Sequence, residues 1–288
     1  LSEEGYDINR PLADLFVELN NDPRFLFEDS DEGREAILDE YRRINEETYA
    51  MLPDYFNELP KAKVVVKRVP IFSEKSAAGG YYQGSSLDGS RPAAWYANLY
   101  DINATQTFKM PALSFHEAVP GHHLQIALNQ ENQNQTLWTK FGYRTSAFSE
   151  GWALYAERLA VEAGLLRDPY EQIGSLQSEL FRAARLVVDT GLHSKKWTRE
   201  EAIIYMMDNA GEVRSESESE IERYIVWPGQ ATSYMIGRIK IMELRERAKA
   251  ELGNRFNIKD FHSVVLMNGI LPLTVLEALV DQYIKENS

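Results

Sequence analysis

The residues best suited to chemistry lie in one short stretch, Ser114-Phe-His-Glu-Ala-Val-Pro-Gly-His-His-Leu-Gln125. The chain has five histidines, and three of them, His116, His122 and His123, fall within eight positions here, with Glu117 directly after the first. Imidazole nitrogens are common zinc ligands, and a glutamate beside a ligating histidine can activate a water molecule for hydrolysis. The stretch therefore predicts a hydrolytic centre with one zinc ion as cofactor.

The spacing departs from the usual arrangement, in which two ligating histidines stand four residues apart on one helix face. His122 lies six residues and His123 seven residues after His116, and Pro120 occupies the position of the usual second histidine. Proline cannot donate to the helical hydrogen-bond ladder, so it kinks or bulges the helix, and Gly121 makes that deformation easier. A bulge could bring either His122 or His123 beside His116. The simpler alternative is that the histidines only fill or cap a helix end.

Two histidines need a third ligand, and Glu150 is the candidate. It lies 34 residues after His116, at the start of a predicted helix that runs from an N-cap at Ser149 to about Ala163. Glu157 follows two turns later on the same face, where it could orient a ligating histidine. Both carboxylates also have a simpler explanation. Glu150 could merely be favourable at a helix N-terminus, and Glu157 could simply be solvated.

Four further side chains could act on a substrate. His193 stands at a glycine-marked helix end one turn after Asp189, and an oriented imidazole can stabilise an oxyanion. Tyr224 and Tyr234 could each donate a phenolic hydrogen bond to the same anion. Arg238, one turn after Tyr234, could hold a substrate carboxylate. Structural roles are also open, because a histidine near a helix C-terminus is favourable by itself.

The composition restricts the partners. The chain has 288 residues, with 31 basic and 44 acidic side chains and a net charge of −13. This charge argues against nucleic acid or an anionic membrane as a partner, and it does not favour acidic substrates. The absence of cysteine excludes disulfides, thiol catalysis and cysteine-ligated zinc. No apolar run is long enough to span a membrane. We expect a small peptide or aminoacyl compound as the substrate.

The beginning of the chain carries no targeting signal. The first residues, Leu1-Ser-Glu-Glu, are not a signal peptide, and there is no initiating methionine. This indicates a processed chain or a fragment, from which a signal could have been lost. The periplasm, with a lipid anchor on a lost N-terminal part, and the cytoplasm are both open as locations.

Hydrophobic periodicity predicts a mainly helical chain. Residues 1–60 read as a helical lead-in, in which apolar residues three and four apart mark a helix over 32–56. Further helices are predicted over 170–192, over 198–209, where Thr198 begins a capping box, and from the break at Pro228-Gly229 to Leu252. Two more helices are expected around Asn268-Gly269. Residues 129–136 are expected to form a loop.

Residues 61–100 differ from the rest and predict a small sheet just before the histidines. The expected strands cover 64–72, 79–82 and 94–99, and the turn-rich residues 84–92 separate the last two. The sheet could be purely structural. Alternatively, an edge strand beside the metal could bind an extended peptide by main-chain hydrogen bonds.

Four motifs together resemble the bacterial domain-of-unknown-function 885 family, and the resemblance covers the chain from about Gly79 onward. They are His116-Glu-Ala-Val-Pro-Gly-His-His-Leu-Gln125, Glu150-Gly-Trp-Ala-Leu-Tyr-Ala-Glu157, Val188-Asp-Thr-Gly-Leu-His193 and Pro228-Gly-Gln-Ala-Thr-Ser-Tyr234. Members of that family are usually considerably longer. The resemblance therefore implies that residues 1–288 are a single catalytic domain from the C-terminal half of such a protein, with 101–288 as its helical catalytic part.

The family is distantly similar to the gluzincin metallopeptidases. This implies a zincin-like, mainly helical fold with a small sheet beside the metal-site helix. It also implies that His116, His122 and Glu150 hold zinc and that Glu117 is the general base, with His123 still open as the second histidine. The expected function is zinc-dependent hydrolysis of peptide or aminoacyl amide bonds. A non-peptide amide hydrolase using the same site, and a binding protein with a degenerate zincin fold, are the alternatives.

Overall fold

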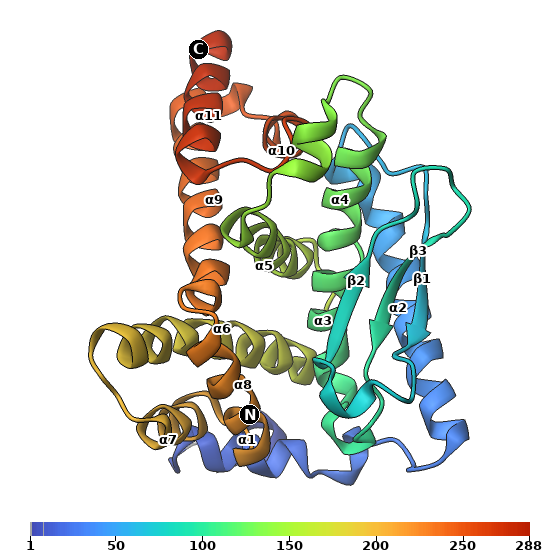
Figure 1. Ribbon diagram of the computed structural model, residues 1–288, viewed down its shortest axis with the longest axis vertical. Coiled ribbons are helices and arrows are strands. Elements are labelled where there is room, and N and C mark those ends of the chain that lie inside the picture. The colour runs from blue at the N-terminus through green and yellow to red at the C-terminus, as the bar shows by residue number, and fades with distance from the viewer. Residues whose placement is uncertain (1, 8) are drawn as a thin grey trace.

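The computed structural model describes residues 2–7 and 9–288 and is mainly helical, with a small three-stranded sheet on one side (Figure 1). Both the helical majority and the small sheet were predicted and are confirmed. The helices are α1 (Leu12–Asn20), α2 (Asp31–Tyr55), α3 (Met110–Glu117), α4 (His122–Glu131), α5 (Ser146–Glu162), α6 (Pro169–Ser194), α7 (Arg199–Ala210), α8 (Arg214–Val226), α9 (Gln230–Leu252), α10 (Ile258–Leu266) and α11 (Leu273–Asn287). None of these helices in the described part of the chain combines the length and the apolarity that a membrane crossing needs.

Local signals in the sequence account for several helix boundaries. The predicted helix over 32–56 is α2, and the helical lead-in consists of α1 and α2. The predicted capping box opens α7, where Thr198 and Glu201 each bond the backbone N–H of the other. The break at Pro228-Gly229 separates α8 from α9, and Gly229 has the positive φ of 79° that favours glycine.

Some element boundaries were predicted wrongly. Residues 69–72 do not continue the first strand, because Pro70 has no N–H to donate and the chain turns there. Residues 129–131 are helical and not part of a loop. Helix α4 continues to Glu131 because Leu124 and Leu128 are buried in the core, and this packing outweighs the low helix propensity of the Asn-rich sequence.

The sheet consists of β1 (Val64–Arg68), β2 (Gly80–Gln83) and β3 (Ala93–Ala97), in the order β1–β3–β2. β3 pairs parallel with β1 and antiparallel with β2. Helix α2 packs on the sheet, where Tyr41 meets Trp95 edge to face with 4.5 Å between ring centroids. The edge strand β2 packs against α3, which carries His116 and Glu117 (Figure 1). The sheet therefore lies beside the histidine helix, as the sequence predicted.

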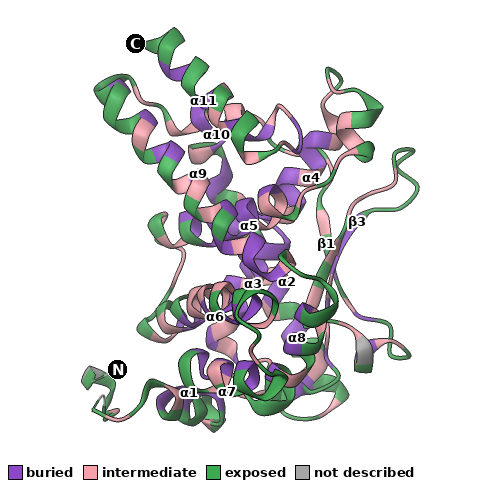
Figure 2. Cartoon of the chain, turned by 60° about the vertical axis from the view of Figure 1, so that its left-hand side comes forward, coloured by how far each residue is buried: buried purple, intermediate pink, exposed green. Residues whose placement is uncertain are grey.

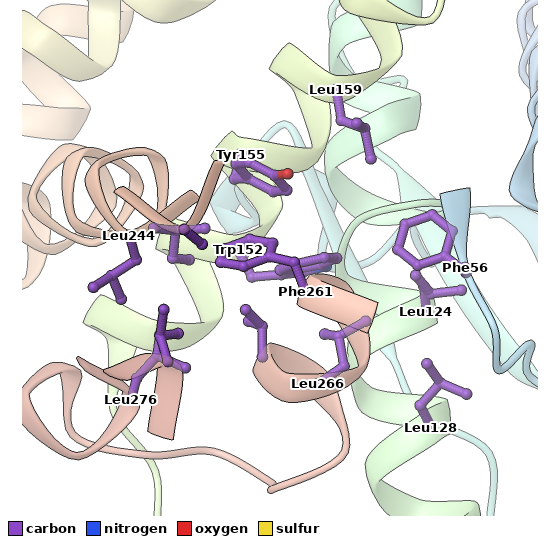
Figure 3. Packing of buried hydrophobic residues seen from close by; sticks show 14 of the residues in the cluster. Phe56, Leu124, Leu128, Trp152, Tyr155, Leu159, Leu244, Phe261, Leu266 and Leu276 are labelled. Carbon is purple, nitrogen blue, oxygen red and sulfur yellow. The ribbon is translucent and has the colours of Figure 1, made fainter. Parts of the chain in front are cut away.

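Helix α5 runs through the largest apolar core and is buried along most of its length (Figure 2). Trp152 and Tyr155 are fully buried and pack among apolar side chains of α4, α9 and α10 (Figure 3). Burial of large aromatic side chains is among the strongest contributions to folding. Because α5 also carries Glu150 and Glu157, this core fixes the positions of two candidate site residues.

Helices α5 and α9 cross at two glycines. A Cβ on Gly237 would stand 1.8 Å from the carbonyl oxygen of Ala147, and a Cβ on Gly151 would stand 2.5 Å from the Cα of Gly237. Only hydrogen fits at these positions, so the two backbones come close together. The crossing brings Tyr234, one turn earlier on α9, to the end of α5 that carries Glu150.

A buried polar network joins α2, α5, α9 and α10. The Nδ1 atom of His262 donates to the carbonyl oxygen of Tyr55 at 2.8 Å, so its Nε2 accepts from the hydroxyl of Tyr155 at 2.7 Å. Arg245 donates to the same hydroxyl and pairs with Glu162. Burial lowers the pKa of His262 to about 4. The folded protein therefore keeps this imidazole neutral at ordinary pH.

This difference in pKa predicts a loss of stability in acid. The unfolded chain takes up a proton at His262 below about pH 6.5, whereas the folded protein resists it down to about pH 4. The contribution of this residue is therefore complete above pH 6.5 and is lost as the pH falls towards 4, by on the order of 3 kcal/mol. Urea unfolding followed by circular dichroism at about pH 8 and about pH 5 measures the change.

The variant His262→Gln is the control, because glutamine does not titrate in this range. It should unfold more easily at every pH, but its free energy of unfolding should change less between the two pH values than that of the natural chain. An identical pH dependence in both proteins would contradict the assignment.

Candidate metal centre

The predicted kink in the histidine helix is a complete break. Helix α3 ends at Glu117, α4 begins at His122, and the loop between them contains the proline. Gly121 lets this loop turn back tightly, because a Cβ there would stand 2.0 Å from the carbonyl oxygen of His116. The two histidines therefore belong to different helices, and the spacing of a single continuous helix no longer applies to them.

The break turns His122 towards His116. The two rings meet edge to face with 4.8 Å between centroids. The Oε2 atom of Glu150 lies 3.3 Å from the Nε2 of His116 and 3.2 Å from the Nε2 of His122. A carboxylate oxygen of Glu117 and one nitrogen of each histidine all lie within 4.8 Å of one another. Four of the predicted site residues thus meet at one point, a candidate metal site that we call the metal centre for short.

His123 is not part of the metal centre. Its Nε2 donates to the carbonyl oxygen of Ala62 at 2.9 Å, and its Nδ1 accepts from the hydroxyl of Tyr82 at 3.0 Å. The side chain is fully buried, and burial lowers the pKa of His123 to about 4. Both nitrogens are used, one to join α4 to β2 and the other to join it to the segment before β1, so the structure brings His122 and not His123 beside His116.

Helix α5 supplies both glutamates. It begins at Ser146 with Thr145 as N-cap, so the predicted start at Ser149 was wrong and Glu150 lies in the second turn. An N-terminal location therefore does not explain Glu150. The buried carboxylate of Glu157 accepts a hydrogen bond from the Nδ1 of His116 at 2.7 Å. This is the orienting contact that the sequence suggested for Glu157.

The carboxylates around His116 stabilise positive charge at this point. Burial by itself would lower the pKa of His116, but the hydrogen bonds to Glu150 and Glu157 outweigh burial and raise this pKa to about 9. Burial would raise the pKa of Glu150, yet the neighbouring His122 and His116 hold it well below its usual range. An ionised carboxylate therefore faces a nitrogen that strongly favours carrying positive charge.

The donor atoms of the metal centre fit zinc. The Oε2 of Glu117 is buried with no hydrogen-bond partner among the described residues, and such atoms are rare. Ligand atoms on a tetrahedral zinc ion stand about 3.3 Å apart, given bonds of about 2.0–2.1 Å. The observed 3.3 and 3.2 Å agree with this spacing. His116, His122 and Glu150 could therefore hold zinc. Among the described residues, the Nδ1 of His122 has no hydrogen-bond partner like the one that Glu157 gives His116.

Tyr234 lies beside the metal centre. Its ring is nearly parallel to that of His116, at 16° with 6.2 Å between centroids. Its hydroxyl accepts from the side chain of Gln230 at 3.4 Å, and the guanidinium carbon of Arg185 lies 4.6 Å from the ring centroid. Burial and the charge of Glu150 raise the pKa of Tyr234, so the phenol stays protonated and can donate a hydrogen bond.

Tyr224 and His193 are engaged elsewhere. The hydroxyl of Tyr224 donates to Glu220 and accepts from Arg185, both at 2.7 Å. The Nε2 of His193 donates to the carbonyl oxygen of Tyr224 at 2.9 Å. His193 also stands eight residues after Arg185 on α6, which is about 12 Å further along the helix axis. Of the three predicted oxyanion donors, the structure brings Tyr234 to the histidines.

Arg238 pairs with Glu179 at 2.6 Å and borders a cavity of about 210 Å³ between α5, α6 and α9. Glu157 lines the same cavity. Because Glu179 already balances its charge, Arg238 is less suited to hold a substrate carboxylate than the sequence suggested.

A family model described as "Bacterial protein of unknown function (DUF885)" matches residues 3–280. The chain belongs to the DUF885 family. The resemblance that the four sequence motifs carried is thereby confirmed.

Two solved structures are similar to this DUF885 chain. A "putative lipoprotein" from Colwellia psychrerythraea has a TM-score of 0.93 and 45% sequence identity over 95% of this chain and 47% of its own. A "putative lipoprotein of unknown function" from Shewanella oneidensis has a TM-score of 0.78 and 24% identity over 93% of this chain and 48% of its own. The chain thus spans about half the length of these two proteins. No curated protein matches it.

Trp152, which the sequence interpretation missed, helps to position the metal centre of this DUF885 chain. The indole Nε1 of Trp152 donates to the carbonyl oxygen of Pro120 at 2.9 Å, so the helix that supplies Glu150 also holds the loop between α3 and α4. The Glu-Gly-Trp order contains a signal for this role, because a buried tryptophan usually finds a partner for its N–H.

Gly121→Ala tests whether the tight loop is required. The new Cβ would overlap the backbone carbonyl of His116, which cannot move without moving α3. We expect the free energy of unfolding to fall by about 3 kcal/mol. Gly79→Ala is the matched control, since a Cβ there meets nothing within 4 Å. Equal stability of the two variants in urea unfolding would show that the loop tolerates a side chain at Gly121.

Proposed function

We propose that this DUF885 chain is a zinc-dependent hydrolase that cleaves peptide or aminoacyl amide bonds. The observation that carries the proposal is the meeting of His116, His122 and Glu150 beside the buried Oε2 of Glu117, which has no hydrogen-bond partner among the residues that the structure describes. The two histidines and Glu150 would hold the zinc ion. When bound, zinc supplies Lewis acidity, which polarises a carbonyl group and lowers the pKa of water towards about 7.

Glu117 acts as the general base and then as the general acid. Its unpaired oxygen takes a proton from the attacking water as the new C–O bond forms. It returns this proton to the leaving nitrogen as the C–N bond breaks, so that an amine and a carboxylic acid result. A carboxylate with a satisfied set of hydrogen bonds would be a poorer base, and this is why the free oxygen supports the role.

Tyr234 donates a hydrogen bond to the oxyanion of the tetrahedral intermediate. Its ring lies next to that of His116 and its hydroxyl keeps its proton, whereas the hydroxyl of Tyr224 is already committed to Glu220. One such donor is worth roughly 3 kcal/mol in the transition state.

The arrangement of elements supports a zincin-like fold for this hydrolase. The histidine–glutamate pair lies at the end of α3, the glutamate ligand lies on the later helix α5, and the edge strand β2 packs against α3. An extended peptide could add to the free edge of β2 by main-chain hydrogen bonds, the mode that the sequence suggested for this sheet.

The two similar solved structures support a location in the cell envelope. Both are described as putative lipoproteins, and one is 45% identical to this chain over the matched part, which is 47% of its own length. We infer that the protein is lipid-anchored in the periplasm, where small peptides would be its substrates.

Two glutamate variants test the mechanism. Glu117→Gln should keep zinc but lose at least about 10³-fold in turnover, because the amide is nearly isosteric with the carboxylate but cannot accept a proton. Glu150→Gln should instead weaken zinc binding, because it removes a charged ligand. Metal content by mass spectrometry, beside hydrolysis of a mixed peptide library, separates the two effects.

Hydrolysis by Glu117→Gln at the natural rate would refute the proposed base. A zinc-loaded natural chain that cleaves no amide in the library would favour the alternative of a binding protein. Cleavage of non-peptide amides alone would favour the non-peptide hydrolase.

Tyr234→Phe tests the oxyanion donor. We expect kcat to fall roughly 100-fold with little change in KM, because the hydrogen bond forms mainly in the transition state. Tyr224→Phe is the matched comparison and should leave kcat close to the natural value. If Tyr224→Phe lowered kcat more than Tyr234→Phe, Tyr224 would be the oxyanion donor instead.

A further inference from the structure

A continuous chain of hydrogen bonds connects His116 to helix α6. The Nδ1 of His116 bonds Glu157 Oε1 at 2.7 Å, and Glu157 Oε2 accepts from the hydroxyl of Ser178 at 2.8 Å. Ser178 Oγ in turn accepts from Arg182 Nη1 at 2.6 Å. These four side chains come from α3, α5 and α6, and Glu157 at their centre is only 5% exposed.

Arg182, at the far end of this series of hydrogen bonds, determines which atom donates in each of them. A guanidinium has donors only, so Ser178 Oγ must accept from Arg182. The single hydroxyl proton of Ser178 is then free to point to Glu157, whose carboxylate has acceptors only. His116 must therefore donate from Nδ1. This leaves its Nε2, which faces Glu150 and His122, as the nitrogen that can bind a metal.

We infer that Ser178 and Arg182 are positioning residues for the metal centre, acting on His116 through Glu157. They orient the carboxylate of Glu157 so that His116 presents Nε2 to the metal. The inference depends on the proposed function only in taking His116 as a zinc ligand. Outer contacts of this kind typically change metal affinity about 10- to 100-fold.

A purely structural role makes a different prediction. Arg182 also donates to the carbonyl oxygen of Ser178 at 3.3 Å, and this contact could merely brace α6. Loss of a purely structural contact would lower stability but would leave the zinc affinity of the folded protein unchanged. A positioning role requires zinc affinity to follow the presence of the hydroxyl at position 178 and of the cation at position 182.

Two pairs of variants separate these roles. We expect Ser178→Ala and Arg182→Met each to raise the zinc dissociation constant at least about tenfold, measured by competition with a chromophoric chelator. Ser178→Thr keeps the hydroxyl and Arg182→Lys keeps a donor cation, so each should restore most of the affinity. Thermal unfolding of the metal-free proteins reports any loss of stability separately.

Arg158→Met is the matched control. Arg158 is next to Glu157 on α5, but its guanidinium pairs with Glu162 one turn along the same helix at 3.1 Å. This variant removes a cation from the residue next to Glu157 without touching the hydrogen-bond chain. Its zinc affinity should equal that of the natural chain.

The outcomes are distinct. Unchanged zinc affinity in Ser178→Ala and Arg182→Met overturns the inference, as does an equal loss in Ser178→Thr and Ser178→Ala. If Arg182→Met does not fold, the Ser178 pair decides. The expected affinities without any amide hydrolysis would refute the proposed function and leave the inference intact. A natural chain that binds no zinc would overturn both.

Discussion

A buried carboxylate is costly unless donors or cations surround it, and Glu157 meets this condition on the largely buried helix α5. Burial would raise the pKa of Glu157, but Arg182 and the hydrogen bond from His116 outweigh burial and keep it below its usual value. Its partners come from helices before and after α5 in the chain. One carboxylate thus holds α3, α5 and α6 in register, and the arrangement of His116 against Glu150 depends on that register.

The break between α3 and α4 is the second part of the arrangement. The spacing of six residues would not place His122 beside His116 on a continuous helix, but it does so between two separate helices. Helix α5 stabilises the break through the hydrogen bond from Trp152 to Pro120. The tight return requires Gly121, and the neighbouring His123 joins α4 to the sheet. Residues that look alike in the sequence, such as His122 and His123, therefore have different surroundings and different uses.

Local chemistry could be predicted from the sequence, whereas contacts between distant helices could not. The clustering of His116, Glu117, His122 and His123 in one short stretch depends on residue type and spacing, which the sequence shows directly. The choice of Tyr234 over Tyr224 depends on how α9 crosses α5, which periodicity does not encode. The same holds for Arg182, which looks like one of many charged residues on an amphipathic helix until α6 is packed against α5.

The crossing of α5 and α9 limits how this protein can evolve. Gly151 and Gly237 occupy each other's side-chain space, so a methyl group at either position forces the two helices apart. That displacement would also separate Glu150 on one helix from Tyr234 on the other. The two glycines are thus expected to tolerate change only together, and substitutions are more easily accommodated in the loops than along this crossing.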